Sequence, residues 1–254
     1  MKDPNILITT FGYTWQVVPE LLGFTNPRLV NLYANHPRWL EIEKARWEAL
    51  IQPVDEVLCI ATQGQGSDSA IAALYDWCDT LDSEDVLCLR IWQAANIGDL
   101  ASEADCQRMA ECIYRLVLHA SERVDGGQLT ISLTGGRKTM SSDIQNAAVF
   151  FGCHALVHVI QNETYAQMLR DLRPEDFIRP LPAELRDAVT PLVAGRYEQN
   201  PVVDLNANGP ITGDNFPIPF PDDSGTIDIG TDRPDLVAEI RLVHSEGCIA
   251  SILA

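Results

Sequence analysis

The regular alternation of short apolar runs with helical segments is the feature that most constrains the fold of this chain. Each predicted strand is followed by a segment with helical periodicity, and most strands are continuously apolar, as expected where both faces of a sheet are covered. The pattern therefore predicts a doubly wound α/β domain with a mostly parallel sheet. Strands are predicted at 6–10, 54–61, 85–92, 128–133 and 155–160, and helices at 15–24, 69–81, 102–123 and about 139–151.

We expect this domain to span residues 1–195, with a helical insertion at about 27–51 and two short helices near 163–172 and 182–194. Residues 196–254 differ in composition, because they are acidic and rich in Gly and Pro. The Pro-rich stretch at 217–221 is incompatible with a helix or a central strand. We expect a loop-rich C-terminal extension with short β segments near 226–230 and 237–243.

The charge balance limits the partners of the chain. It has 36 acidic and 18 basic residues, a formal net charge of −18. Duplex nucleic acids and anionic membranes attract basic surfaces, so neither is expected as a partner. A small anion in a local pocket remains compatible with this charge. No apolar run reaches the roughly 20 residues of a membrane span. The N-terminus lacks a signal-peptide pattern, and the seven Cys include no C-x-x-C pair. We therefore expect a cytoplasmic location and no metal site.

Three polar, glycine-bearing loops follow predicted strands, at 9–16, 62–67 and 134–141. In an open α/β sheet, ligands bind beyond the carboxyl ends of the strands. The third loop is the most informative. Gly135 and Gly136 allow a close backbone approach, and Arg137 and Lys138 add two positive charges before a helix whose free N–H groups favour an anion. The loop predicts a phosphate site. The competing interpretation is a tight turn with solvated basic side chains.

Several familiar alternatives do not fit. The G-x-x-x-x-G-K-[ST] pattern of nucleotide triphosphatases is absent, and so is a G-x-G-x-x-G pattern after the first strand. Thr14 and Gln16 are compatible with simple helix capping. Trp92, at the end of the third predicted strand, could stack on a base or close the core.

At residues 132–140, the sequence SLTGGRKTM resembles the S-L-A-G-G-R-K-T-M signature of CRISPR-associated Rossmann-fold (CARF) proteins. The segment GYTWQVV at 12–18 is similar to that family's first-loop pattern G-x-[ST]-P-Q-V-V, with Trp15 in place of Pro. Residues 54–62, 97–112 and 158–160 resemble further family segments in the same order, so that the resemblance spans about 1–165.

The resemblance implies a Rossmann-like homodimer whose paired loops hold a cyclic oligoadenylate, with cyclic tetra-adenylate expected for a two-fold site. We find no R-x4–6-H motif of an attached RNA-cleaving effector. A CARF core of this kind resembles a ring nuclease, which opens the messenger of type III CRISPR systems and switches the response off. The alternative is a sensor that only binds the messenger and signals through the C-terminal extension. An enzyme acting on an unrelated phosphorylated metabolite is a third interpretation.

RNA carries its own nucleophile, so an enzyme that aligns the 2′-OH with the phosphorus and neutralises developing charge needs no metal or other cofactor. On this hypothesis Lys138 and Arg137 act on the phosphate and Thr14 orients the ribose. These three are the expected catalytic residues. The expected ligand-binding residues are Thr10, Gly12, Tyr13, Gln16, Thr62, Gln63, Gly64, Gln65, Trp92, Thr134, Gly135, Gly136, Thr139 and Met140.

Overall fold

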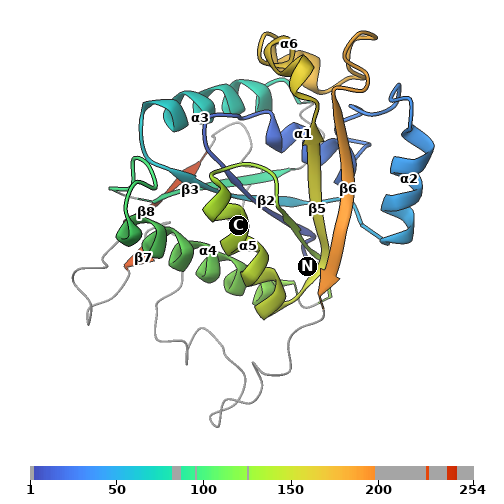
Figure 1. Ribbon diagram of the computed structural model, residues 1–254. Coiled ribbons are helices and arrows are strands. Elements are labelled where there is room, and N and C mark those ends of the chain that lie inside the picture. The colour runs from blue at the N-terminus through green and yellow to red at the C-terminus, as the bar shows by residue number, and fades with distance from the viewer. Residues whose placement is uncertain are drawn as a thin grey trace.

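A computed structural model describes residues 3–81, 87–94, 96–124 and 126–197, together with the backbone of 227–228 and 239–244 (Figure 1). The strands are β1 (Ile6–Phe11), β2 (Glu56–Thr62), β3 (Cys88–Ala94), β4 (Leu129–Ser132), β5 (Cys153–Gln161), β6 (Val189–Tyr197), β7 (Ile227–Asp228) and β8 (Glu239–His244). The helices are α1 (Val17–Thr25), α2 (Trp39–Glu48), α3 (Gln65–Cys78), α4 (Glu103–Arg123), α5 (Lys138–Phe151) and α6 (Ala166–Arg170), with 3-10 turns η1 (Glu163–Tyr165) and η2 (Pro174–Phe177).

All the described strands belong to one sheet, in the order β6-β5-β4-β1-β2-β3-β8-β7. The five strands β1 to β5 are parallel to their neighbours, whereas β6 and β8 pair antiparallel with β5 and β3. The chain winds outward from β1 in both directions, because β2 and β3 lie on one side of it and β4 and β5 on the other. This confirms the predicted doubly wound, mostly parallel α/β fold.

The two faces of the sheet carry separate hydrophobic cores. Successive strand residues point to opposite faces. In β1, Leu7 and Phe11 pack with α1, α3 and the 27–51 segment, while Ile6 and Ile8 pack with α4 and α5. Figure 1 shows α4 and α5 side by side over one face. Because both faces are covered, every residue of β1 and β2 is buried. This explains why their sequences are apolar without alternation.

The predicted helix at 182–194 is wrong. Residues 183–187 form turns, and β6 follows as a strand paired with β5 from Val189↔Gln161 to Tyr197↔Cys153. Pro191 explains why no helix forms here, because proline inside a helix removes a backbone hydrogen bond and clashes with the preceding turn. An outer strand tolerates it. The insertion at 27–51 is helical only over α2, with turns before it.

The short helix near 163–172 is confirmed as η1 and α6, and the short strands near 226–230 and 237–243 are confirmed as β7 and β8. The rest of the predicted extension lies outside the described residues. β8 joins the main sheet through β3, with Arg90↔His244 to Ala94↔Ile240 in register. Within the described residues, no helix combines the length and apolarity that a membrane span requires.

Candidate functional site

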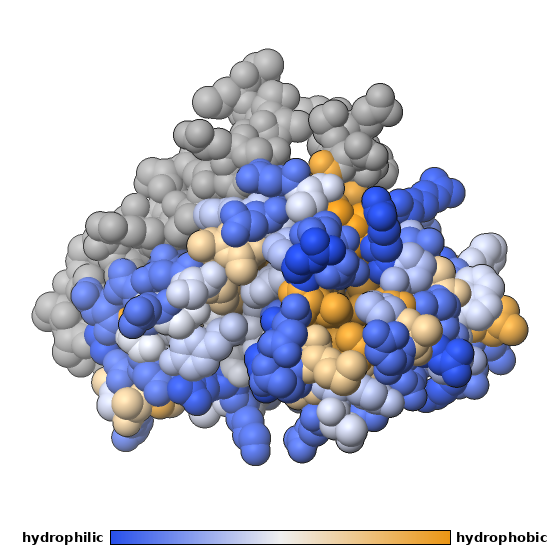
Figure 2. Space-filling model, turned by 90° about the horizontal axis from the view of Figure 1, so that it is seen from above, coloured by the Kyte–Doolittle hydropathy of each residue, from blue (hydrophilic) through white to orange (hydrophobic). Residues whose placement is uncertain are grey.

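The carboxyl ends of β1 and β4 lie next to each other where the strand order reverses. Loops leave these two strands in opposite directions, and the divergence opens a crevice in which α/β proteins bind ligands. A cavity of about 290 Å³ lies there. Figure 2 looks down on this edge and shows apolar surface between strongly hydrophilic groups. The cavity is lined by Gly12, Tyr13, Thr14, Val17, Glu20, Thr62, Thr134, Gly135, Gly136, Arg137, Met140, Val159 and Gln161.

A larger cavity of about 700 Å³ includes Leu129 and Cys153, the first residues of β4 and β5, and therefore lies at the amino ends of the strands. It contains none of the predicted site residues. Because the carboxyl edge carries the glycine-rich loop, the smaller cavity is the candidate site.

Gly135 and Gly136 bring the β4–α5 loop against the end of β1. Both have positive φ angles, +96° and +65°. A Cβ atom on Gly135 would lie 2.1 Å from the Thr10 carbonyl oxygen, so no other residue fits without displacing the backbone. Both the positive φ of this turn and its close contact with the end of β1 therefore require glycine. The GG pair is required by the packing of two loops, whatever ligand binds.

Threonine hydroxyls tie the same two loops together. Thr9 donates to the Thr134 carbonyl at 3.0 Å and Thr10 donates to the Gly135 carbonyl at 3.2 Å. The Thr134 hydroxyl accepts from the Val159 N–H at 2.7 Å and lies 3.1 Å from Nδ1 of His158. Burial lowers the pKa of His158. Thr10, which was expected to bind the ligand, is fully buried and its hydroxyl is engaged in the hydrogen bond to the Gly135 carbonyl.

Tyr13 connects three loops at the mouth of the cavity. Its ring covers the backbone at Gly66, where an added Cβ would lie 2.2 Å from ring atoms. The Arg137 guanidinium lies over the same ring, 5.9 Å from its centre. The ring is nevertheless 62% exposed. The loops after β1, β2 and β4 thus meet at one exposed aromatic face.

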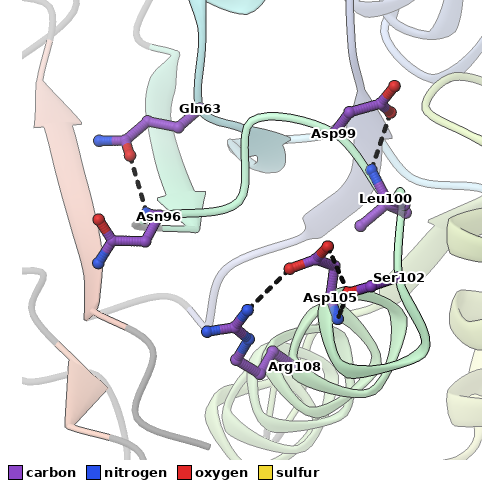
Figure 3. A network of polar contacts seen from close by, with 7 residues as sticks. All are labelled: Gln63, Asn96, Asp99, Leu100, Ser102, Asp105 and Arg108. Atoms are coloured by element: carbon purple, nitrogen blue, oxygen red, sulfur yellow. Dashed lines mark hydrogen bonds and ion pairs between the residues drawn. The ribbon is translucent and has the colours of Figure 1, made fainter.

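Arg137 is paired with Asp99, from the loop between β3 and α4. Its Nε and one terminal nitrogen donate to the two carboxylate oxygens at 3.0 and 2.8 Å. Asp99 also accepts from the Leu100 N–H at 2.8 Å (Figure 3). The Asn96 N–H, in the same loop, donates to the side chain of Gln63, which follows β2, at 2.8 Å. Polar contacts therefore hold this loop against the site.

The helix after that loop begins as predicted. Ser102 accepts from the Asp105 N–H at 3.1 Å and donates to its carboxylate at 2.6 Å (Figure 3). Arg108 donates to the other carboxylate oxygen of Asp105 at 2.7 Å. These contacts make Ser102 the N-cap of α4.

Lys138 and Thr139 are the first two residues of α5, and both are exposed. Lys138 forms no ion pair with any described residue. It differs in this respect from Arg137, although the two are adjacent. Thr14, on the facing loop, is also exposed. The first turn of α5, next to Arg137 and Met140 of the cavity lining, therefore offers backbone N–H groups and, among the described residues, one uncompensated cation, Lys138.

Glu20 is the residue that sequence reasoning missed. It lies on α1, lines the cavity and is only 3% exposed. Its Oε1 is buried without a hydrogen-bond partner among the described residues. Burial raises the pKa of Glu20 to about 8. The sequence feature that could have identified Glu20 is its position as a single charged residue within the apolar run VVPELLGF.

The cavity lining contains nine of the seventeen predicted residues: Gly12, Tyr13, Thr14, Thr62, Thr134, Gly135, Gly136, Arg137 and Met140. Lys138 and Thr139, the first residues of α5, adjoin the cavity but are not part of its lining. Trp92 is 3% exposed and packs in the core with α4, so of the two interpretations the structure supports the one in which it closes the core. Thr10 and Gln16 are also buried and do not line the cavity. Gln63 and Gly64 lie in the β2–α3 turn and Gln65 begins α3, and these three residues are also outside the lining. The cavity adds Val17, Glu20, Val159 and Gln161, which were not predicted.

A Rossmann-like sheet with a Gly-Gly-Arg-Lys-Thr loop at its switch point defines a CARF-like protein. The family model described as CRISPR-associated protein NE0113 matches residues 47–200, more than half of the chain. The chain therefore belongs to this family of CRISPR-associated proteins, which confirms the CRISPR association predicted from the loop motifs.

Comparison with solved structures gave thirty matching chains. One is Enterococcus italicus Csm6 bound to cyclic hexa-2'-fluoro-hexa-dAMP, with a TM-score of 0.39 and 14% sequence identity. The match covers 75% of this chain and 41% of that one, so this chain spans well under half of that protein's length. No curated protein matched the sequence.

Proposed function

We propose that this protein binds a cyclic oligoadenylate, with cyclic tetra-adenylate as the expected ring, and opens it without a metal ion. One observation carries the proposal: the cavity at the β1/β4 switch point adjoins the first turn of α5, where Lys138 has no ion-pair partner among the described residues. A phosphodiester needs a cationic and N–H-rich rim, and a nucleoside needs a partly apolar recess. The described site offers both, and membership in a CRISPR-associated family supports this class of ligand.

The proposed reaction is an in-line displacement at phosphorus. The ribose 2′-oxygen attacks the adjacent phosphorus, the bond from phosphorus to the 5′-oxygen breaks, and the products carry a 2′,3′-cyclic phosphate and a 5′-hydroxyl. The proton of the 2′-OH goes to solvent, and the leaving 5′-oxygen takes one from solvent. Lys138 stabilises the charge that develops on the phosphoryl oxygens, and Thr14 holds the ribose in line.

We also propose that two copies of the chain share one ring. The cavity, at about 290 Å³, has room for one nucleoside rather than for a cyclic tetranucleotide. A two-fold dimer presents two such cavities to a symmetric ring. Sedimentation with and without ligand tests this point. Two chains per bound ring is the expected stoichiometry, and one chain per ring would contradict it.

The decisive test is cleavage of cyclic tetra-adenylate in EDTA under single-turnover conditions. We expect linear products with cyclic phosphate ends, and about a 100-fold slower rate for Lys138→Ala, the usual scale for losing one charge-stabilising donor. Lys44→Ala is the matched control, because Lys44 is also an exposed helical lysine but lies on α2. An unchanged rate for Lys138→Ala would refute the assigned site.

One observation favours the binding-only alternative. The Arg137 charge is compensated by Asp99, so within the described part of the chain the first turn of α5 has one free cation rather than the two predicted. A sensor needs only affinity, for which Lys138 and the first turn of α5 suffice. Tight binding of an intact ring over hours would establish the sensor and exclude the nuclease. Absence of any oligoadenylate binding would refute both and favour an unrelated phosphorylated metabolite.

A further inference from the structure

We infer that Glu20 recognises the adenine base, its carboxyl group pairing with the N6 amino group and an adjacent ring nitrogen. This inference rests on the proposed function and adds to it the group that reads the base. It starts from a geometric fact: Glu20 is an acidic side chain buried in the lining of the candidate cavity, with Oε1 unpartnered among the described residues.

No described contact gives the Glu20 carboxyl a structural role. Its backbone carbonyl accepts from the Tyr33 hydroxyl at 2.9 Å, but no described side chain forms an ion pair with the carboxylate. Arg137 lines the same cavity and is held by Asp99. A buried polar atom without a partner costs roughly 1–3 kcal/mol. Unpartnered buried groups of this kind are common at ligand-binding sites, since the bound ligand supplies the missing hydrogen bonds.

The rest of the lining has the composition of a base pocket. Val17, Met140 and Val159 supply apolar walls, and Gln161 adds an amide. Such a recess with few polar groups accepts a flat heterocycle and fixes its orientation. A neutral carboxyl offers one donor and one acceptor side by side, as a glutamine amide does. Adenine offers the complementary pair, a donor at N6 and an acceptor at the neighbouring ring nitrogen.

The Glu20 carboxyl is neutral at physiological pH, because burial raises its pKa to about 8. Three neighbouring groups, His158, His36 and Tyr33, stay uncharged between pH 7 and 9. Burial lowers the pKa of His158 and of His36, and burial raises that of Tyr33 well above its usual value. The titratable and charged groups on the elements around Glu20 include Tyr13, Tyr33, His36, Glu43 with its partner Arg46, Arg137 and His158. The elements packed against α1 also carry Glu41, Lys44, Glu48, His154 and Arg196.

The test is the affinity for cyclic tetra-adenylate at pH 6.5 to 9.5, measured on the full chain by calorimetry. For the wild type we expect constant affinity below pH 8 and a loss approaching tenfold per pH unit and per bound base above it. Glu20→Gln keeps a donor and an acceptor, so it should bind with no such fall. Glu20→Leu keeps the volume without hydrogen bonds and should bind at least tenfold more weakly at pH 7.

Two controls separate base recognition from a general effect on the fold. Glu163→Gln removes an exposed carboxyl beyond β5 and should behave as the wild type. A cyclic tetramer of purine riboside, which lacks the N6 amino group, should bind the wild type more weakly than cyclic tetra-adenylate, and Glu20→Leu should not distinguish the two rings.

The outcomes keep this inference apart from the proposed function. If the wild type binds cyclic tetra-adenylate and Glu20→Leu binds it equally well, Glu20 does not read the base, while the proposed function stands. Equal pH profiles for the wild type and Glu20→Gln would also overturn the inference. If the wild type binds no oligoadenylate at any pH, both the proposed function and the inference fall.

Discussion

Asp99 holds Arg137, which lines the candidate cavity, in a two-point ion pair with nitrogen–oxygen distances of 3.0 and 2.8 Å. The pair joins the loop after β3 to the loop after β4, and both side chains are about half exposed. Its contribution to stability is therefore small, at most about 1 kcal/mol. Its effect on charge is larger, because it neutralises one of the two cations that the sequence places at this rim.

Removing this carboxylate should strengthen anion binding. We expect Asp99→Asn to bind cyclic tetra-adenylate several-fold more tightly than the wild type at low salt, since Arg137 then becomes available to a phosphate. The gain should shrink as salt screens the added charge. Fluorescence anisotropy at two salt concentrations measures both effects. Asp171→Asn, an exposed change beyond α6, is the control, and weaker binding by Asp99→Asn would show that the pair positions Arg137 for the ligand.

Gly135 should be intolerant of any side chain. Gly135→Ala would place a Cβ 2.1 Å from the Thr10 carbonyl oxygen at a φ of +96°, so the β4–α5 loop must shift. We expect a loss of about 2–3 kcal/mol in the free energy of unfolding. Gly12→Ala is matched within the same cavity lining, because its Cβ meets nothing within 4 Å. Urea denaturation measures both, and equal losses would contradict the proposed constraint.

Glu20 should make stability depend on pH. Its pKa is about 8 in the folded chain against 4.5 as the ordinary value, so the folded state binds its proton more tightly. The associated stability is full below pH 4.5 and is lost as the pH rises towards 8. Glu20→Gln cannot ionise, so its advantage over the wild type should widen from pH 5.5 to pH 8, reaching on the order of 2–4 kcal/mol. Melting curves at the two pH values measure it, and a constant difference would contradict the shift.

Neutralising the buried Glu56 should destabilise the fold more than neutralising an exposed carboxylate. Glu56 is 4% exposed at the start of β2 and pairs with Arg90 at 2.9 Å and with Arg123 at 2.8 Å. Glu56→Gln leaves two cations beside a buried site, which should cost about 2–4 kcal/mol in the free energy of unfolding. Glu41→Gln removes the exposed partner of Arg38 and should cost under about 0.5 kcal/mol. Similar costs for the two changes would show that burial is not the deciding factor.

Much of the architecture was predictable, because local sequence carries the physical cause. The apolar runs at β1 and β2 are continuous since both faces of each strand are covered. Ser102 caps α4 through its own side chain, and Gly152 ends α5 with a positive φ. The Gly135–Gly136 pair was likewise visible, since only glycine adopts such a turn at low cost.

Other features depend on partners far away in the sequence. β6 forms because it can pair with the free edge of β5. From the sequence of 182–194 alone, a helix was predicted. Trp92 packs in the core with α4 rather than at the rim. This depends on which face of the sheet each residue of β3 points to. The pairing of Arg137 with Asp99 joins two loops that are 38 residues apart.

The sequence by itself determined the alternation of strands and helices, the glycine turn after β4 and the presence of Arg137 and Lys138 beside it, because each follows from local backbone preference or from residue identity. Only the tertiary structure decided which of these charges is free, which aromatic ring is exposed and that Glu20 lines the cavity. Burial and charge pairing are properties of atoms brought together by folding. The same glutamate is an ordinary charged residue in the chain and a neutral carboxyl once α1 packs against the sheet.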